Sequence, residues 1–160
     1  ADPSYVTVVS DLRSAGGKVL GYVSTGYTAR DPAAVKADVD SFTVFYDIDG
    51  IFLDEMTNDT LAAHYAYYAE LYAYIKGRYP AFRVVGNPGA PTQEAYLLLP
   101  AADGLVTFEN GADYPEYVPD PWVFAYSPEH FGHIPYGVAS AGTMRKRAAS
   151  QAPCSRMNSG

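Results

Sequence analysis

The sequence predicts an α/β fold of the (β/α)-barrel type, in which parallel strands alternate with helices. Short apolar runs of strand length alternate with stretches of about ten to twenty residues that have helical periodicity, and this alternation favours a parallel sheet. Two runs, 49–55 and 103–109, share one layout: an Asp-Gly turn, an apolar strand, and a carboxylate where the strand should open into a loop. Carboxylates at the carboxyl ends of parallel strands are how such a barrel presents an active site.

The first part of the chain contains two expected helices and two strands. An Asp-Pro pair at 2–3 is typical of an N-cap and a first helical residue, and a Gly-Gly pair should end this helix at 16–17. Residues 19–24 then have strand character. A second Asp-Pro pair, at 31–32, starts another helix that keeps helical spacing as far as Tyr46. The first acidic strand follows it.

The middle of the chain repeats this order. Asp59 or Thr60 should cap a long third helix that ends near Gly77, and residues 82–86 form the next strand. An Asn-Pro-Gly sequence then makes a turn. Pro91 should open a short helix that stops at Pro100, just before the second acidic strand.

Beyond Asn110 the pattern is weaker. Residues 111–121 hold three prolines and several acids, which predicts a long loop, and 122–126 and 134–138 are weaker strand candidates. The small, basic and polar residues at 140–160 predict a weakly ordered tail. Four strong and two weak strands are too few for a closed eight-stranded barrel, which usually takes about 200 residues or more. We therefore expect one domain, 1–139, with the fold of a partial barrel.

Composition narrows the classes of function. A chain of 160 residues with 48% apolar content can bury one sizeable core. The net charge of -7 argues against nucleic acid or an anionic membrane as a partner. No apolar run approaches the roughly 18 residues of a membrane span. Fifteen tyrosines would suit a sugar-binding cleft, although we expect most of them simply to pack on helix surfaces.

Neither a metal site nor a serine-hydrolase site is indicated. His64 stands alone on a helix, and the pair His130 and His133 has no acidic or cysteine partner at ligand spacing. Ser24 and Ser127 lack the Gly-x-Ser-x-Gly elbow of a hydrolase nucleophile. We therefore expect no metal and no cofactor.

The carboxylates that end the two acidic strands are the candidate catalytic residues. Cleavage of a glycosidic bond needs one carboxylic acid to protonate the leaving oxygen and one carboxylate to attack or to activate water. Glu55 and Glu109 have the same offset from their Asp-Gly turns, so strand alternation predicts that both point into the barrel, together with Ile51 and Leu53. Asp54 would point outward unless the strand has already broken. We therefore expect Glu55 and Glu109 as the working pair, with Asp54 as acid, nucleophile or electrostatic partner.

Other polar and aromatic residues are candidates for substrate binding. Tyr22, Thr25 and Tyr27 lie at the end of the first strand, on the expected catalytic face, and Asn87 could bind a sugar hydroxyl from its turn. Structural roles compete with each of these roles. Tyr22 could equally belong to the core, Asn-Pro-Gly suits a tight turn for its own sake, and Asp54 could cap the helix that follows it.

Four ordered motifs resemble the spherulin-4 family, also called spherulation-specific family 4. They are VLGYVSTGY at 19–27, DGIFLDEM at 49–56, GNPG at 86–89 and VTFEN at 106–110. The resemblance covers about residues 1–136 and implies a glycoside hydrolase of β/α-barrel fold. Family members characterised as enzymes cleave galactosamine-containing polysaccharide internally, at α-1,4-linked N-acetylgalactosamine. By this resemblance Asp54, Glu55 and Glu109 are the catalytic acids, a polysaccharide is the substrate, and the protein is secreted or at the cell surface.

The resemblance also implies differences and leaves alternatives. A family member would have two strands before Ala1 and a further acidic segment after the last strand, so we expect an incomplete barrel. No signal peptide opens the chain. A non-catalytic carbohydrate-binding or spore-coat protein that keeps the barrel motifs is one alternative, because fold alone does not imply activity. A hydrolase of deacetylated polygalactosamine is another, since a cationic sugar suits the net charge. The sequence does not predict an oligomeric state.

Overall fold

The computed structural model describes residues 1–111, 114–140 and 142–143. One parallel sheet has its five strands in the order β1-β2-β3-β4-β5. The strands are β1 (Leu20–Ser24), β2 (Gly50–Asp54), β3 (Arg83–Gly86), β4 (Gly104–Asn110) and β5 (Phe131–Pro135). The helices are α1 (Pro3–Ser14), α2 (Pro32–Phe45), α3 (Ala62–Arg78) and α4 (Ala95–Leu98), with 3-10 turns at η1 (Tyr114–Glu116), η2 (Pro121–Ala125) and η3 (Pro128–His130).

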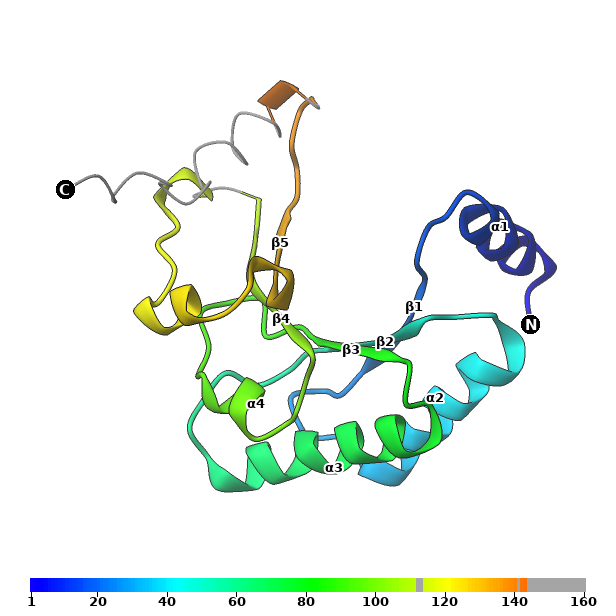
Figure 1. Ribbon diagram of the computed structural model, residues 1–160, viewed down its shortest axis with the longest axis horizontal. Coiled ribbons are helices and arrows are strands. Elements are labelled where there is room, and N and C mark those ends of the chain that lie inside the picture. The colour runs from blue at the N-terminus through cyan, green and yellow to red at the C-terminus, as the bar shows by residue number, and fades with distance from the viewer. Residues whose placement is uncertain (112–113, 141, 144–160) are drawn as a thin grey trace.

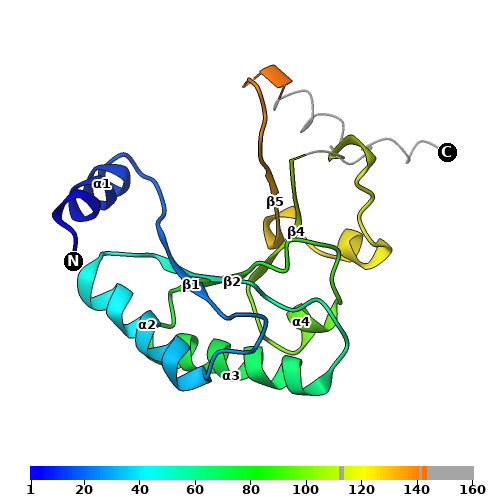
Figure 2. The same ribbon diagram turned by 180° about the vertical axis from the view of Figure 1, so that it is seen from behind.

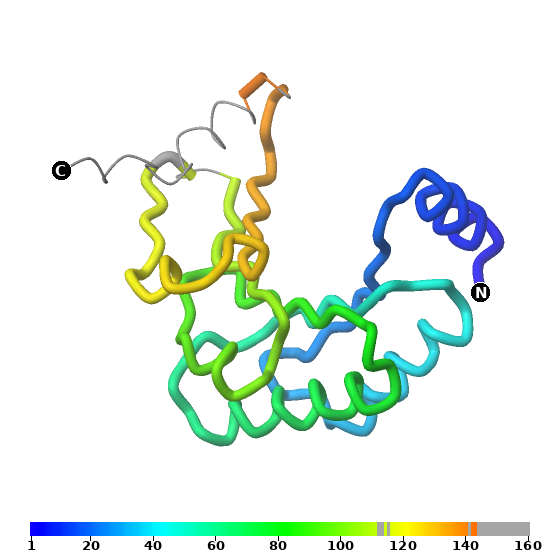
Figure 3. The backbone as a smooth tube through the Cα atoms, in the orientation of Figure 1, coloured from blue at the N-terminus to red at the C-terminus, as the bar shows by residue number. Residues whose placement is uncertain are grey.

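The sheet is open, and its helices are gathered on one face. Figures 1 and 2 show α2 and α3 on the same side, while α1 and the end of β5 rise on the other side, from opposite ends of the sheet. Figure 3 shows the same course of the backbone. Strands in sequence order with helices on one face are the arrangement of a (β/α) barrel, whereas a doubly wound sheet carries helices on both faces. In the described residues β1 does not pair with β5, so a closed barrel is not observed.

The predicted helix starts are confirmed for α1 and α2. The carboxylates of Asp2 and Asp31 each accept a backbone N–H of the first turn, at 2.9 and 2.8 Å, and a proline follows each of them. The sequence predicts the first residues of α3 and α4 too early. The N-cap of α3 is Leu61, whose N–H is bound by Asp59 at 2.9 Å, and α4 begins at Ala95 rather than at Pro91.

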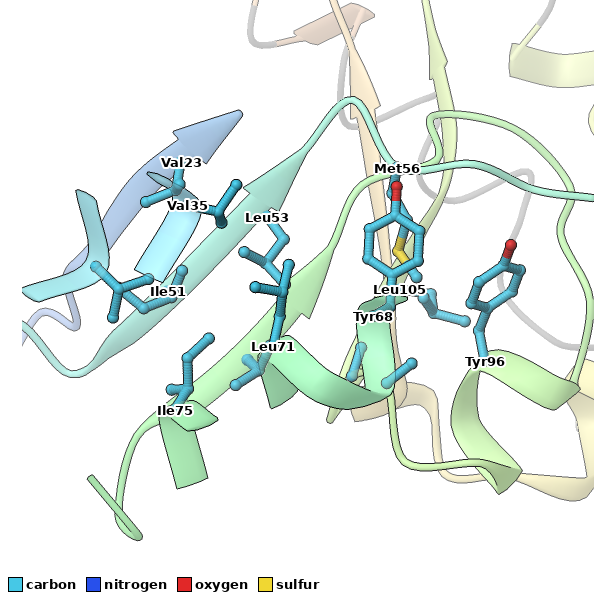
Figure 4. Packing of buried hydrophobic residues seen from close by; sticks show 14 of the residues in the cluster. Val23, Val35, Ile51, Leu53, Met56, Tyr68, Leu71, Ile75, Tyr96 and Leu105 are labelled. Atoms are coloured by element: carbon cyan, nitrogen blue, oxygen red, sulfur yellow. The ribbon is translucent and has the colours of Figure 1, made fainter. Parts of the chain in front are cut away.

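The core lies between the sheet and the helices (Figure 4). Ile51 and Leu53 are fully buried there, each worth about 1.5–3 kcal/mol relative to an exposed side chain. Their position corrects the predicted orientation of β2, because both face the helices and not the interior of a barrel. The alternate side chains, such as Tyr22 and Phe52, therefore lie on the opposite, open face.

The two Asp-Gly turns have a structural role at the amino ends of the strands. Asp49 accepts the backbone N–H of Val19 at 2.9 Å, which is the largest cause lowering its pKa to about 2. Burial alone would raise the pKa of Asp103, but the N–H of Val84, at 2.8 Å, and other donors bring it below its ordinary value. A Cβ at Gly50 would lie 2.0 Å from a backbone oxygen of the next strand. The repeated turn therefore joins neighbouring strands.

The last part of the chain departs from the prediction. Residues 122–126 were a weaker strand candidate, yet η2 occupies Pro121–Ala125, because proline fixes φ in the helical range and β5 already pairs with β4. The last strand begins at Phe131, earlier than the predicted 134–138, and ends before Gly137 with φ 62°. The expected loop at 111–121 contains η1, with 112–113 outside the described residues. The predicted tail at 140–160 lies almost wholly outside them too.

Candidate active site

An open cleft of about 420 Å³ lies at the carboxyl ends of the strands, where β/α folds carry their active sites. All three predicted catalytic acids line it, and so do two of the predicted substrate-binding residues. The lining residues are Tyr27, Asp54, Glu55, Asn87, Pro88, Gly89, Glu109 and Tyr136. Five of the residues that the sequence singled out therefore lie at one cleft.

Asn87 joins two of the acids. Its side-chain Nδ2 donates one hydrogen bond to Asp54 Oδ1 and one to Glu109 Oε2, each 2.7 Å long. An amide nitrogen carries two hydrogens, so both are used by the carboxylates. Because the two oxygens lie 2.7 Å from one nitrogen, their separation is at most twice that distance, about 5.4 Å. The two acids that Asn87 links are thus Asp54 and Glu109, whereas the sequence predicted Glu55 and Glu109 as the working pair.

A break in strand alternation brings Glu109 into the cleft. Leu105 is buried in the core, and without a break Glu109, four residues on, would face the same way. The pairing of β4 with β5 skips Thr107, since Val106 pairs with Gly132 and the next pair begins at residue 108. Such a bulge re-aims the side chains that follow it. Glu109 therefore reaches Asn87 on the open face.

A tyrosine donates a hydrogen bond to the other carboxylate oxygen of Asp54. Tyr22, 54% exposed on the open face, donates from its hydroxyl to Asp54 Oδ2 at 2.6 Å. This bond is the main cause that raises the pKa of Tyr22 to about 12. The ring stacks on Phe52 with centroids 6.3 Å apart. The sequence offered substrate binding or core packing for Tyr22; in the structure it orients a carboxylate, is not buried and is not among the residues that line the cleft.

Glu55 lies where β2 has already ended. Its φ of 54° is in the left-handed region, which is uncommon for a residue other than glycine. Its side chain accepts a hydrogen bond from the hydroxyl of Ser24, and its carbonyl accepts the N–H of Tyr27 at 2.7 Å. The strand alternation on which the prediction for Glu55 rested does not extend to this residue.

The Asn-Pro-Gly turn also binds Glu109 by a hydrogen bond between backbone groups. The N–H of Glu109 donates to the carbonyl of Gly89 at 2.9 Å. Gly89 has φ 64°, and a Cβ there would lie 3.4 Å from Glu109 Oε2. The turn therefore has both roles that were weighed from the sequence: it is a tight turn, and its Asn side chain reaches the acids.

Thr25 and Tyr136 differ from what the sequence predicted for the substrate-binding surface. Thr25 was expected to contact substrate, but it is fully buried and binds the backbone carbonyl of Glu55 at 2.8 Å. Tyr136, 57% exposed, lines the cleft although the sequence did not single it out. The only signal for it is its place just after β5, and that strand was predicted too late. Tyr27 lines the cleft with 61% of its surface exposed, as expected.

The histidines have local partners. His64 contacts Asp59 at 2.9 Å, His130 contacts the carbonyl of Asp103 at 2.7 Å, and His133 contacts a tyrosine hydroxyl at 2.8 Å. Among the described residues, no group of three or more His, Cys, Asp or Glu side chains could hold a metal ion. Within the same residues, no helix has the length and hydropathy to cross a membrane.

The chain is similar to known proteins in sequence and in structure. The model of the family described as "Spherulation-specific family 4" matches residues 1–157. Spherulin-4 of Physarum polycephalum is 36% identical over 110 residues, which are 68% of this chain and 32% of that protein. The crystal structure of Aspergillus clavatus Sph3 in complex with GalNAc superposes with a TM-score of 0.75 and 27% identity, over 93% of this chain and 66% of that one. This chain therefore spans about a third of its curated relative.

Proposed function

The chain belongs to spherulation-specific family 4, as its four motifs indicated, and we propose that it is a glycoside hydrolase acting on galactosamine-containing polysaccharide. The bond cleaved is that of internal, α-1,4-linked N-acetylgalactosamine. The observation that carries the proposal is the pair Asp54 and Glu109, which share the amide of Asn87 in an open cleft. The solved relative was crystallised with GalNAc, which supports this class of sugar. We propose a secreted or cell-surface protein, since a polymer of this kind is an extracellular substrate.

The spacing of the pair favours a retaining reaction. Carboxyl groups of retaining glycosidases are about 5–5.5 Å apart, whereas inverting enzymes keep about 6.5–9.5 Å for a water molecule. The closest oxygens of Asp54 and Glu109 are at most about 5.4 Å apart. One of them would attack the anomeric carbon while the other, as a carboxylic acid, gives its proton to the leaving oxygen. Water, deprotonated by the second residue, would then hydrolyse the glycosyl ester.

Glu55 has a supporting part in this scheme. It lines the same cleft as the pair, and Ser24 fixes its carboxylate by a hydrogen bond. A third negative charge in the cleft favours the positive charge that develops on the sugar in an oxocarbenium-like transition state. We therefore assign Glu55 an electrostatic role beside Asp54 and Glu109.

Two tyrosines would bind the faces of the sugar rings. Tyr27 and Tyr136 line the cleft, and each exposes more than half of its surface. An exposed ring with a hydroxyl can stack on a pyranose face and form a hydrogen bond at the same time. These residues would hold the polysaccharide while the carboxylates act on one of its linkages.

The test is release of reducing ends from purified N-acetylgalactosamine polysaccharide. Glu109→Gln and Asp54→Asn should each lower the rate at least about a hundredfold, because each removes one of two required carboxyl functions. Glu70→Gln is the matched control, since Glu70 pairs with Lys36 on the helical surface. Full activity in Glu109→Gln would remove this residue from the site. Binding without cleavage by the folded chain would favour the carbohydrate-binding or coat function, and cleavage of only the deacetylated polymer would change the substrate.

A further inference from the structure

We propose that Thr25 and Tyr68 are positioning residues that hold the backbone of Asp54 and Glu55 so that both carboxylates face the cleft. Neither can touch a substrate, because both side chains are fully buried. The importance of this arrangement for catalysis rests on the proposed function. Its structural part is a series of hydrogen bonds from α3 to the loop that carries Tyr27, and this part does not depend on the proposed function.

The backbone around the cleft adopts conformations that need support. Glu55 has φ 54°, and Gly26, Tyr27 and Thr28 form a run of left-handed residues with φ 56°, 52° and 71°. Left-handed backbone is unfavourable for L-residues and persists only where neighbouring groups enforce it. The groups that enforce it here must therefore be found among the contacts of the two loops.

The hydrogen bonds around Thr25 have only one consistent direction. Thr25 Oγ1 lies 2.8 Å from the carbonyl of Glu55 and 3.0 Å from that of Asp54, and carbonyls only accept, so the one hydrogen of the Thr25 hydroxyl is shared between them. Tyr68 Oη lies 3.1 Å from Thr25 Oγ1 and must be the donor of that bond. The N–H of Thr57 then donates to Tyr68 Oη at 3.0 Å. Every hydrogen in this chain is assigned.

The last acceptor in this series of hydrogen bonds is a backbone carbonyl that connects the loop after β1 to the loop after β2. The carbonyl of Glu55 accepts the Thr25 hydroxyl and also the N–H of Tyr27, at 2.7 Å. Figure 4 shows Tyr68 reaching from α3 to the segment near Met56, which directly follows Glu55. Loss of the Tyr68 hydroxyl would remove the donor to Thr25 Oγ1. The hydroxyl of Thr25 could then rotate, and the Glu55 carbonyl, which binds the N–H of Tyr27, would be held less firmly.

Hydrogen exchange tests this series of hydrogen bonds and needs no measurement of enzymatic activity. In Tyr68→Phe we expect faster exchange of the Thr57 amide, which loses its acceptor, and at least about tenfold faster exchange of the Tyr27 amide, which Tyr68 does not contact. Tyr72→Phe is the matched control: Tyr72 lies on the same helix and donates to Asp103 at 2.7 Å, away from the cleft. An effect confined to Thr57, with Tyr27 unchanged, would overturn the proposal.

Kinetics on the N-acetylgalactosamine polymer tests positioning. Thr25→Val should lower kcat at least about tenfold, because the carboxylates shift, and should raise KM by less than about threefold, because Tyr27 is loosened while Tyr136 keeps its place. Thr25→Ser, which keeps the hydroxyl, should retain at least about a third of kcat. Equal losses in both variants, or a change in KM alone, would contradict a positioning role. If the unmodified chain cleaves nothing, the proposed function fails, and the exchange experiment alone decides this proposal.

Discussion

Replacement of Asn87 by alanine removes the side-chain amide that links the two acids. Both hydrogens of its amide are bound to Asp54 and Glu109 at 2.7 Å, so the substitution deletes two hydrogen bonds to carboxylates. Such bonds are worth about 1.5–3 kcal/mol each. Because the cleft is open and water can replace part of this interaction, we expect a loss of about 2–4 kcal/mol in transition-state stabilisation. That corresponds to a roughly 30- to 1000-fold lower kcat.

The loss should fall on kcat and spare KM. Asn87 has no amide hydrogen left for a sugar, so ground-state binding should change less than about threefold. The free energy of unfolding should fall by no more than about 1–2 kcal/mol, since the freed carboxylates can turn toward water. Initial rates of reducing-end release over a range of polymer concentrations, with urea unfolding of the same samples, separate these quantities.

Asn58→Ala is the matched control for this experiment. Asn58 is exposed and donates to the carbonyl of Pro91 at 3.2 Å, outside the cleft lining. Its kcat should stay within twofold of the unmodified chain. A folded Asn87→Ala protein with more than a third of the original kcat, or with its loss entirely in KM, would refute the reasoning.

Three further changes have defined outcomes. Asp49 has a folded pKa of about 2, below its ordinary 3.8, so it stabilises above pH 4 and the contribution is lost as pH falls toward 2; urea unfolding of Asp49→Asn should show a deficit of about 1–2 kcal/mol at pH 7 that shrinks toward pH 2. Gly89→Ala should lower the free energy of unfolding by about 1 kcal/mol and also lower kcat, because φ is 64° there and the new Cβ meets Glu109; Gly77→Ala, with open space around it inside α3, should stabilise instead, and equal effects at the two glycines would contradict the account. Tyr136→Ala should raise KM about two- to tenfold with little change in kcat, whereas an unchanged KM would remove this ring from the binding surface.

Local signals predicted most of the fold. The Asp-Pro caps, the Asp-Gly turns and the apolar runs between them act within a few residues, so α1, α2 and the first four strands lie close to their predicted positions. The end of the chain was harder to predict. There η2 and β5 depend on which segment pairs with the free edge of β4, and that competition is decided by tertiary contacts.

The sequence singled out Asp54, Glu55 and Glu109, which all line the cleft, but it did not predict that Asn87 links Asp54 to Glu109. Strand alternation predicted Glu55 beside Glu109, but two local breaks change the faces of these residues. The left-handed backbone of Glu55 ends the alternation in β2, and the bulge at Thr107 shifts it in β4. Both breaks depend on partners distant in sequence, such as Thr25 and β5, so the spacing of residues could not reveal that Asp54 is the partner of Glu109.

The anomeric form of the first product tests the central claim, that Asp54 and Glu109 cleave the polymer as a closely spaced pair. Proton NMR of a defined α-1,4-linked N-acetylgalactosamine oligosaccharide, recorded from the start of digestion, resolves the two anomers before they interconvert. The oxygens of Asp54 and Glu109 that Asn87 binds are at most about 5.4 Å apart, and this spacing predicts that the α-anomer appears first. A β-anomer as the first product, or no product from the folded chain, would contradict the account.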